Sequence, residues 1–232
     1  MRLLQVGPLD PGYPAGLHLA GRAPLLWWRG TLGPDGERCV AVVGTRSPSP
    51  AGLARARSLA RELAGAGVTV VSGLARGIDT AAHEACLDAG GRSIAVLGSG
   101  IGEVYPPENA GLADRIAAHG AVLSQLPPDA QVSPGALRRR NAVIAALAAA
   151  TVVVEAGPTS GARITARCAL DLGRHLLLSD LVAGAPWARA LLTRAGVCRL
   201  APDAGVEPLL ARLVGGPPTA PVQLALAVGA GW

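Results

Sequence analysis

The sequence predicts an α/β fold: an extended Rossmann-like, doubly wound domain with a mostly parallel sheet and helices on both faces. Three observations support this prediction. Apolar runs rich in β-branched residues alternate with helix-like runs from Cys39 onward. Three of these runs end directly in a short glycine-rich segment, as strands of parallel sheets do where they present backbone N–H groups. The runs also lack polar alternation, which is typical of strands buried on both faces.

The expected elements divide the chain into three parts. Residues 1–36 are rich in Pro and Gly, and we expect an irregular lead-in with one short edge strand near Leu26–Arg29. Residues 37–215 contain the alternating runs and form the expected Rossmann-like domain. Residues 216–232 form a Pro/Gly-rich tail, for which we expect little fixed structure.

The alternating runs give the strands and helices in chain order. Strands are expected at residues 39–43, 68–71, 93–97, 121–124, 151–155 and 175–178. Helices are expected at about residues 50–65, 78–89, 108–118, 138–149, 161–172 and 185–195. Asp79 is expected to cap the second helix, and Gly90 and Gly91 to end it. Gly173 is expected to end the helix that begins near Gly161.

The composition narrows the class of protein. All 21 basic residues are arginines, and the net charge of +5 is compatible with a nucleic-acid partner. The four cysteines form no C-x-x-C pair, so neither a metal site nor a disulfide framework is expected. We expect no targeting segment, and the apolar stretch Val222–Trp232 is shorter than the roughly 20 residues of a membrane span. The sequence therefore predicts a cytoplasmic protein without a membrane partner.

Glycines, hydroxyls and arginines follow the predicted strands. The loops at 44–46, 72–79, 98–100 and 155–161 all lie at carboxyl ends of strands, where open parallel sheets bind their ligands. Backbone N–H groups in such loops bind phosphate, and a guanidinium forks onto phosphate oxygens. We therefore expect one groove that binds a polyanion, with Arg46 and Arg76 in the same pocket.

A cluster of three arginines and one asparagine, Arg138–Asn141, lies at the predicted start of another helix. In one interpretation it is simply an exposed helix start after the Pro134-Gly135 turn. In the other, the three guanidinium groups bind successive phosphates and Asn141 binds a base edge. Cations at a helix N-terminus oppose the helix dipole, and this favours the binding interpretation.

The sequence offers no obvious catalytic set. It contains no G-x-S-x-G elbow, no metal-binding histidine pair and no G-x-x-x-x-G-K-[ST] loop. The spacing of Gly98, Gly100 and Gly102 breaks the dinucleotide fingerprint, so no cofactor is expected. The four histidines have no matching partners, and we expect each to be satisfied or exposed. The sequence thus predicts a site that binds rather than reacts.

Several segments together resemble a known family. They are Gly44–Arg46, Ser72–His83, Val96–Gly100, Tyr105-Pro106, Glu108-Asn109, Arg139–Asn141, Val154–Gly157 and Ser160-Gly161. This combination is similar to the signature of the DprA/Smf DNA-processing proteins, and the resemblance covers about residues 9–212. It implies a protein that binds single-stranded DNA without catalysis, protects incoming strands in natural transformation and loads the recombinase RecA, as a homodimer.

The loops, the arginine cluster and the resemblance together give the expected DNA-binding residues. They are Gly44, Arg46, Ser72, Gly73, Arg76, Gly77, Gly98, Ser99, Gly100, Arg138, Arg139, Arg140, Asn141, Ser160, Gly161 and Arg163. The chain departs from the family pattern at Ala142, where a basic residue is usual. It also lacks the Pro-Gly turn and Gly-Thr-Asn-like segment after Leu178, near the surface the family uses for dimerisation and RecA binding.

Two alternative functions remain open from sequence. A lysine-decarboxylase-like phosphoribohydrolase, which cleaves nucleoside monophosphates, shares the Rossmann-like sheet and the glycine loops. Its hallmark loop has a double glycine and a following catalytic glutamate, both of which are missing from Gly157–Ala162. A small-nucleotide sensor would keep the same pocket and bind a monomer in place of the polymer.

Overall fold

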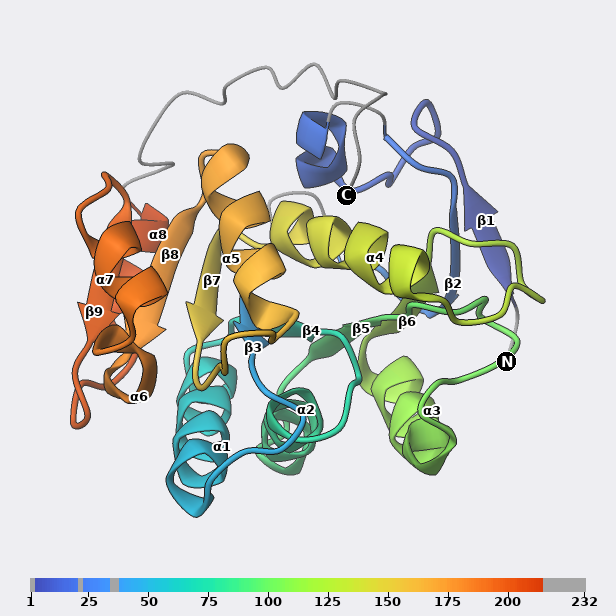
Figure 1. Ribbon diagram of the computed structural model, residues 1–232. Coiled ribbons are helices and arrows are strands. Elements are labelled where there is room, and N and C mark those ends of the chain that lie inside the picture. The colour runs from blue at the N-terminus through green and yellow to red at the C-terminus, as the bar shows by residue number, and fades with distance from the viewer. Residues whose placement is uncertain (1–2, 21–22, 34–37, 215–232) are drawn as a thin grey trace.

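The computed structural model describes residues 3–20, 23–33 and 38–214. These residues form one nine-stranded sheet in the order β1-β2-β6-β5-β4-β3-β7-β8-β9, shown in Figure 1. The strands are β1 (Leu4–Val6), β2 (Leu26–Gly30), β3 (Cys39–Val43), β4 (Thr69–Ser72), β5 (Ser93–Val96), β6 (Ala121–Ser124), β7 (Ala150–Val153), β8 (His175–Ser179) and β9 (Val197–Leu200). The expected tail at 216–232 lies outside the described residues.

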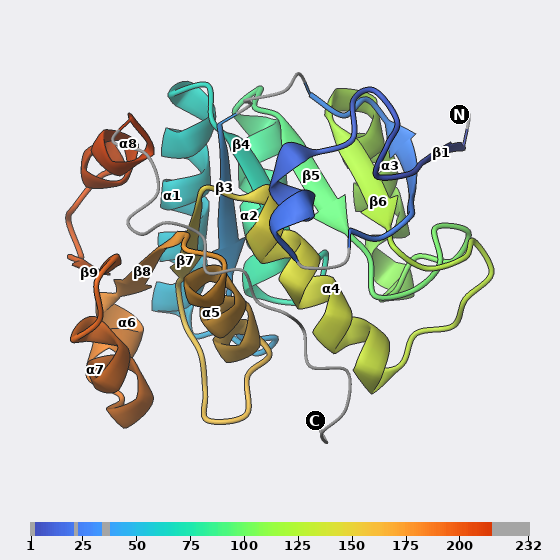
Figure 2. The same cartoon turned by 90° about the horizontal axis from the view of Figure 1, so that it is seen from above.

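Helices connect the strands and cover both faces of the sheet (Figures 1 and 2). The α-helices are α1 (Pro50–Gly65), α2 (Ile78–Asp88), α3 (Ala110–His119), α4 (Pro134–Leu147), α5 (Ala162–Asp171), α6 (Asp180–Ala183), α7 (Pro186–Leu192) and α8 (Glu207–Val214). Two short 3-10 helices are η1 (Ala15–Ala20) and η2 (Pro107–Asn109). Within the described ranges, no helix is long and apolar enough to cross a bilayer.

The strand pairing is that of a doubly wound α/β fold. All pairs from β6 to β9 are parallel, and only β1 and β2 add in antiparallel fashion at one edge. Successive strands from β3 to β6 extend the sheet in one direction, and β7 then returns to the other side of β3. The strand order therefore reverses between β3 and β7, and the fold class expected from sequence is confirmed.

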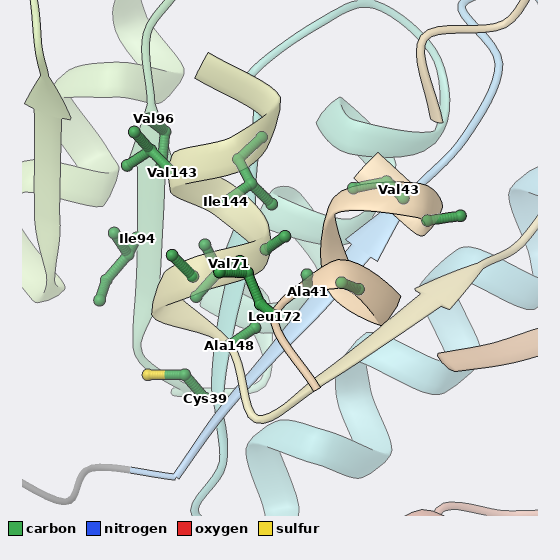
Figure 3. Close-up of a cluster of buried hydrophobic side chains, with 14 of the residues drawn as sticks. Cys39, Ala41, Val43, Val71, Ile94, Val96, Val143, Ile144, Ala148 and Leu172 are labelled. Atoms are coloured by element: carbon green, nitrogen blue, oxygen red, sulfur yellow. The ribbon is translucent and has the colours of Figure 1, made fainter. Parts of the chain in front are cut away.

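Each strand of the sheet centre contributes to two hydrophobic layers. Val40 and Val42 of β3 pack with α1 and α2 on one face. Ala41 and Val43 pack with α4 and α5 on the other face, and Figure 3 shows this layer around Val143 and Ile144 of α4. Successive strand residues point to opposite faces, so a run without polar residues is required when both faces are covered.

The six expected strands and six expected helices are all present, with some shifted ends. Gly90 and Gly173 have positive φ and end their helices as expected, each donating its N–H to a carbonyl of the last turn. The strand expected near Leu26–Arg29 is present as β2, but β1 pairs with its outer side, so β2 is not the edge strand that the sequence predicts. The elements expected from sequence do not include β1, β9, η1 and α6, which are short.

One expected helix start and one expected helix cap are wrong. Helix α4 begins at Pro134 rather than Arg138, because the Ser133 hydroxyl accepts a hydrogen bond from the N–H of Ala136 at 3.1 Å. The arginine cluster therefore lies beyond the first turn of α4, and the helix-dipole argument for it does not hold. Asp79 does not cap α2 either, because Gly77 occupies the cap position and the Asp79 carboxylate binds elsewhere.

The lead-in adds to the sheet through β2. Its residues pair with β6 from Trp27 opposite Ser124 to Gly30 opposite Ala121. Leu26 is fully buried in the main core, and Trp28 packs partly buried against it. The apolar side chains of this part of the lead-in therefore serve to pack β2 onto the core, and stacking on nucleic-acid bases is not needed to explain them.

Replacing Leu26 by Ala tests whether the lead-in contributes to folding stability. We expect a loss of about 2–5 kcal/mol in the free energy of unfolding, because a fully buried leucine leaves a cavity. Leu25→Ala is the matched control, since its side chain is 38% exposed. Chemical denaturation of both variants measures the difference, and equal stabilities would contradict a structural role for β2.

Candidate nucleic-acid interface

A groove lies at the carboxyl ends of the central strands, where the strand order reverses. It holds about 430 Å³, which is in the range of roughly 300–1,000 Å³ typical of ligand sites. The loop after β3, the first turns of α4 and the start of α5 line it. The lining residues are Val43, Gly44, Thr45, Arg46, Ala75, Asp79, Pro134, Leu137, Arg138, Arg140, Asn141, Ile144, Gly157, Thr159, Ser160, Gly161, Ala162, Ile164 and Thr165.

The loop after β3 is fixed by its backbone. The N–H of Thr45 donates to the carbonyl of Glu155 at 2.7 Å, and the Thr45 carbonyl accepts from the N–H of Ile78 at 3.2 Å. A Cβ at Gly44 would lie 2.4 Å from Cγ1 of Ile78, so only glycine fits between these segments. The exposed side chain of Arg46 therefore projects from a well-held backbone.

A small second pocket adjoins the groove. Its lining contains Arg46, Arg76 and Tyr105, and it shares Ala75, Leu137, Arg140 and Arg46 with the groove. The structure thus brings Arg46 and Arg76 into one pocket, as expected from sequence. The sequence indicates Tyr105 only as part of the segments that resemble the family. The structure places it in the lining of the same pocket as the two arginines.

The guanidinium of Arg140 is buried beneath this surface, with 5% of the residue exposed. Its Nη1 donates to the carbonyl of Val96 at 2.7 Å and to the carbonyl of Gly73. A Cβ at Gly73 would lie 2.3 Å from the same Nη1. One side chain on α4 therefore ties together the carboxyl ends of β4 and β5, and it requires glycine at position 73.

Asp79 is the charge partner of Arg140. Its carboxylate is buried and accepts a hydrogen bond from the N–H of Gly73 at 3.1 Å. Burial raises the pKa of Asp79, and the positive charge of Arg140 acts in the opposite direction. Burial lowers the pKa of Arg140 to about 10, an effect that Asp79 counters and nearby Arg46 adds to. Each group thus favours the charged form of the other and opposes the effect of burial on its pKa.

The three adjacent arginines therefore do not act alike, which corrects the expectation that all three bind phosphates. Arg138 is exposed and lines the groove, whereas Arg139 is exposed outside its lining. Arg140 uses its donors on backbone carbonyls inside the protein. Asn141 is also buried, and its Nδ2 donates to the carbonyl of Gly161 at 3.3 Å, which joins α4 to the start of α5.

The start of α5 forms the opposite wall of the groove. Ser160 and Gly161 line it as expected, and the structure adds Thr159 and Thr165. Arg163 points away from the groove, because its guanidinium lies over the ring of Trp187 at 5.3 Å and donates to the Pro158 carbonyl. Arg163 is therefore not brought into the expected site.

Other expected residues lie beneath or beside the groove. The Ser72 hydroxyl is buried and donates to the carbonyl of Val42 at 2.7 Å, and that of Ser99 donates to the Glu103 carbonyl at 2.6 Å. Gly98 and Gly100 are buried against Leu137 and the Pro127–Pro128 backbone. Gly77 has a φ of +81° and supports the turn into α2. These positions shape the surrounding loops rather than line the groove.

Sequence reasoning missed the apolar part of the lining, namely Leu137, Ile144 and Ile164. Apolar residues of amphipathic helices such as α4 and α5 are expected to face the sheet, so nothing local marks these three as groove residues. Among the lining residues, three arginines face a single carboxylate, that of buried Asp79. The groove is therefore cationic. No cluster of three metal-ligating side chains occurs in the part of the chain that the structure describes.

The sequence comparisons identify the family. The family model for DNA recombination-mediator protein A matches residues 5–189. This chain belongs to that family. Protein Smf of Synechocystis is 42% identical over 174 residues, covering 73% of this chain and 44% of the relative. DNA processing protein DprA of Streptococcus pneumoniae is 41% identical over 169 residues, covering 72% and 60%. The resemblance to DprA/Smf is confirmed, and the chain spans only part of these relatives' length.

Solved structures agree with this assignment to the DNA recombination-mediator protein A family. The X-ray structure of DprA from Streptococcus pneumoniae has a TM-score of 0.79 and 33% identity, over 91% of this chain and 74% of that chain. DprA from Helicobacter pylori has a TM-score of 0.77 at 24% identity, over 93% and 97%. The molybdenum cofactor carrier protein of Chlamydomonas reinhardtii has a TM-score of 0.55 at 18% identity, over 77% and 99%, and shares the fold alone.

Replacing Arg140 by Met is expected to destabilise the fold by about 3–5 kcal/mol, because Asp79 would lose its buried charge partner. Arg139→Met removes a neighbouring exposed guanidinium and is the matched control, with a change within about 0.5 kcal/mol. Urea denaturation of both variants measures these values. A stable Arg140→Met protein would contradict the role assigned to the buried pair.

His83 makes the stability of the fold dependent on pH. Its ring is fully buried and hydrogen-bonds to Ser93, and burial, assisted by Arg140, lowers its pKa from 6.5 to about 3. Below pH 6.5, His83 is protonated in the unfolded chain and stays neutral in the folded protein. The free energy of unfolding therefore falls as the pH falls. Between pH 7 and pH 5 we expect this effect of His83 to lower the free energy of unfolding by about 2 kcal/mol.

His83→Asn isolates this effect. It removes the titrating ring, and the contribution of Asp79, whose shift has the opposite sign, is common to both proteins. The difference in free energy of unfolding between wild type and variant should shrink from pH 7 to pH 5. A difference that is constant with pH would contradict a buried neutral histidine.

Proposed function

We propose that this protein binds single-stranded DNA in the groove at the carboxyl ends of β3 and β7, and that it does so without catalysis. The observation that carries the proposal is the placement of Arg46, Arg76 and Arg138 around the groove and the small pocket that shares part of its lining. They belong to separate segments, so their guanidinium groups can follow the phosphates of a flexible strand.

The lining of the site supports a single strand over a duplex. The groove has α4 on one side and the start of α5 on the other, and it is lined by apolar as well as charged residues. Leu137 and Ile164, which are not buried, offer contacts to bases that only an unpaired strand exposes. Pairing would keep base faces stacked and present phosphates on a rigid surface.

The family relatives support the same assignment. Those at 38–45% identity include proteins named as DNA processing proteins. The structure of the Helicobacter pylori neighbour is described in terms of its single-stranded DNA binding mode. That description belongs to the neighbour, which shares the fold at 24% identity. The arginines around the groove of this chain supply the independent support.

The proposal includes the finer role that the DprA/Smf resemblance implies: protection of incoming strands in the cytoplasm, RecA loading during natural transformation, and a homodimer. For the dimer, Trp187 is the best candidate contact. It is only partly buried, against the core and under Arg163, whereas Leu209 is fully buried in its own domain. Light scattering of wild type and Trp187→Ala tests this part, and a monomer at every concentration would refute it.

Replacing Arg46 by Ala is expected to weaken binding of a single-stranded oligonucleotide by about 1–3 kcal/mol, because a charge-assisted phosphate contact is lost. The salt dependence should also fall, by about 0.7 in the slope of log K against log salt. Arg57→Ala is the matched control, because Arg57 is exposed on α1 and lies outside the groove lining. Fluorescence anisotropy at several salt concentrations measures both.

The same titration separates the alternative functions. Single-stranded DNA should bind more tightly than duplex DNA and more tightly than a mononucleotide. Equal binding of the duplex would contradict the single-strand assignment. A mononucleotide that binds better than the polymer would instead identify a small-nucleotide sensor.

A further inference from the structure

One arginine of the proposed DNA site is already occupied by an acidic side chain. The guanidinium of Arg76 forms an ion pair, through Nε, with a carboxylate oxygen of Glu108. Both side chains are about half exposed, at 53% and 48%. Glu108 raises the pKa of Arg76, and Arg76 lowers the pKa of Glu108, so both stay charged around neutral pH.

The pairing distinguishes Arg76 from the other exposed arginines of the region. Across residues 3–20, 23–33 and 38–214, the structure gives Arg46, Arg138 and Arg139 no ion pair. Arg76 nevertheless lines the same small pocket as Arg46. A phosphate that approaches this pocket therefore meets one free guanidinium and one that is held by a carboxylate.

The neighbouring asparagine holds the pair in place. Asn109 is buried, and its Nδ2 donates to the carbonyl of Leu74 at 2.8 Å and lies 2.9 Å from the Thr80 hydroxyl. Leu74 is fully buried with a φ of +56°, which fixes the course of this loop. The segment that carries Glu108 is thus anchored to the loop that carries Arg76, although they are 32 residues apart.

We propose that Glu108 is an affinity-setting residue of the DNA site, whose carboxylate occupies on Arg76 the place that a DNA phosphate takes. This inference rests on the proposed function and deepens it. A carboxylate and a phosphate oxygen offer the same kind of acceptor to a guanidinium. An exposed ion pair is weak, so a strand that already contacts Arg46 displaces Glu108 at a modest cost.

Displacement also changes the salt dependence. When Glu108 leaves Arg76, it becomes an exposed carboxylate near the DNA backbone. Arg76 and Glu108 together then neutralise less phosphate charge than an unpaired arginine would. Removing the carboxylate charge should therefore strengthen binding and steepen the slope of log K against log salt, by up to about 0.7 for one additional phosphate contact.

Glu108→Gln tests the inference, because it keeps the shape of the side chain and removes its charge. We expect single-stranded DNA to bind roughly two- to five-fold more tightly at low salt, with a steeper salt slope. Asp114→Asn is the matched control. It removes one charge from another exposed ion pair, with Arg29, outside the pocket and groove. It should leave affinity near that of wild type.

A double variant shows whether the effect passes through Arg76. In an Arg76→Gln background, adding Glu108→Gln should no longer change DNA affinity, whereas a general charge effect would persist. If wild type binds DNA and Glu108→Gln binds no better than Asp114→Asn, the inference alone is overturned. If none of the proteins binds oligonucleotide, the proposed function is overturned together with it.

Discussion

The rest of the site depends on the contacts that the buried guanidinium of Arg140 makes. It reaches from α4 across the sheet edge, binds the carbonyls of Gly73 and Val96, and faces the buried carboxylate of Asp79. Each of the two charges would be costly to bury alone, and together they hold the carboxyl ends of β4 and β5 and the start of α2 in one arrangement. The loop after Gly73, which carries Arg76, begins from this fixed point.

The topology of the sheet determines where the groove lies relative to Arg140. The strand order reverses between β3 and β7, so the loops that follow these strands diverge toward opposite faces and leave a groove. Helix α4 borders this groove, and consecutive residues of one short segment serve two purposes there. Arg140 and Asn141 are buried and join neighbouring elements, while Arg138 is exposed and lines the groove. A buried structural charge and an exposed charge at the groove thus lie close together in sequence.

Much of the fold could be predicted because its signal is local and repeated. Apolar runs and glycine-rich ends located the central strands and showed which loops share an edge of the sheet. The role of Arg140 could not be predicted, because three consecutive arginines look alike until Ser133 sets the start of α4 and thereby the direction of each side chain. Arg163 was misplaced for a similar reason, since its contact with Trp187 joins residues far apart in the chain. Pairs of this kind depend on tertiary packing.

Hydrogen–deuterium exchange with and without a single-stranded oligonucleotide tests the central claim most directly, because it reports on both ends of the sheet at once. The account predicts that DNA slows exchange in the loops at the carboxyl ends of the strands, residues 44–47 and 157–162. The loops at the opposite ends, residues 66–68 and 90–92, should exchange at the same rate in both samples. Protection confined to those opposite loops, with none around the groove, would contradict the assignment of this groove as the DNA site.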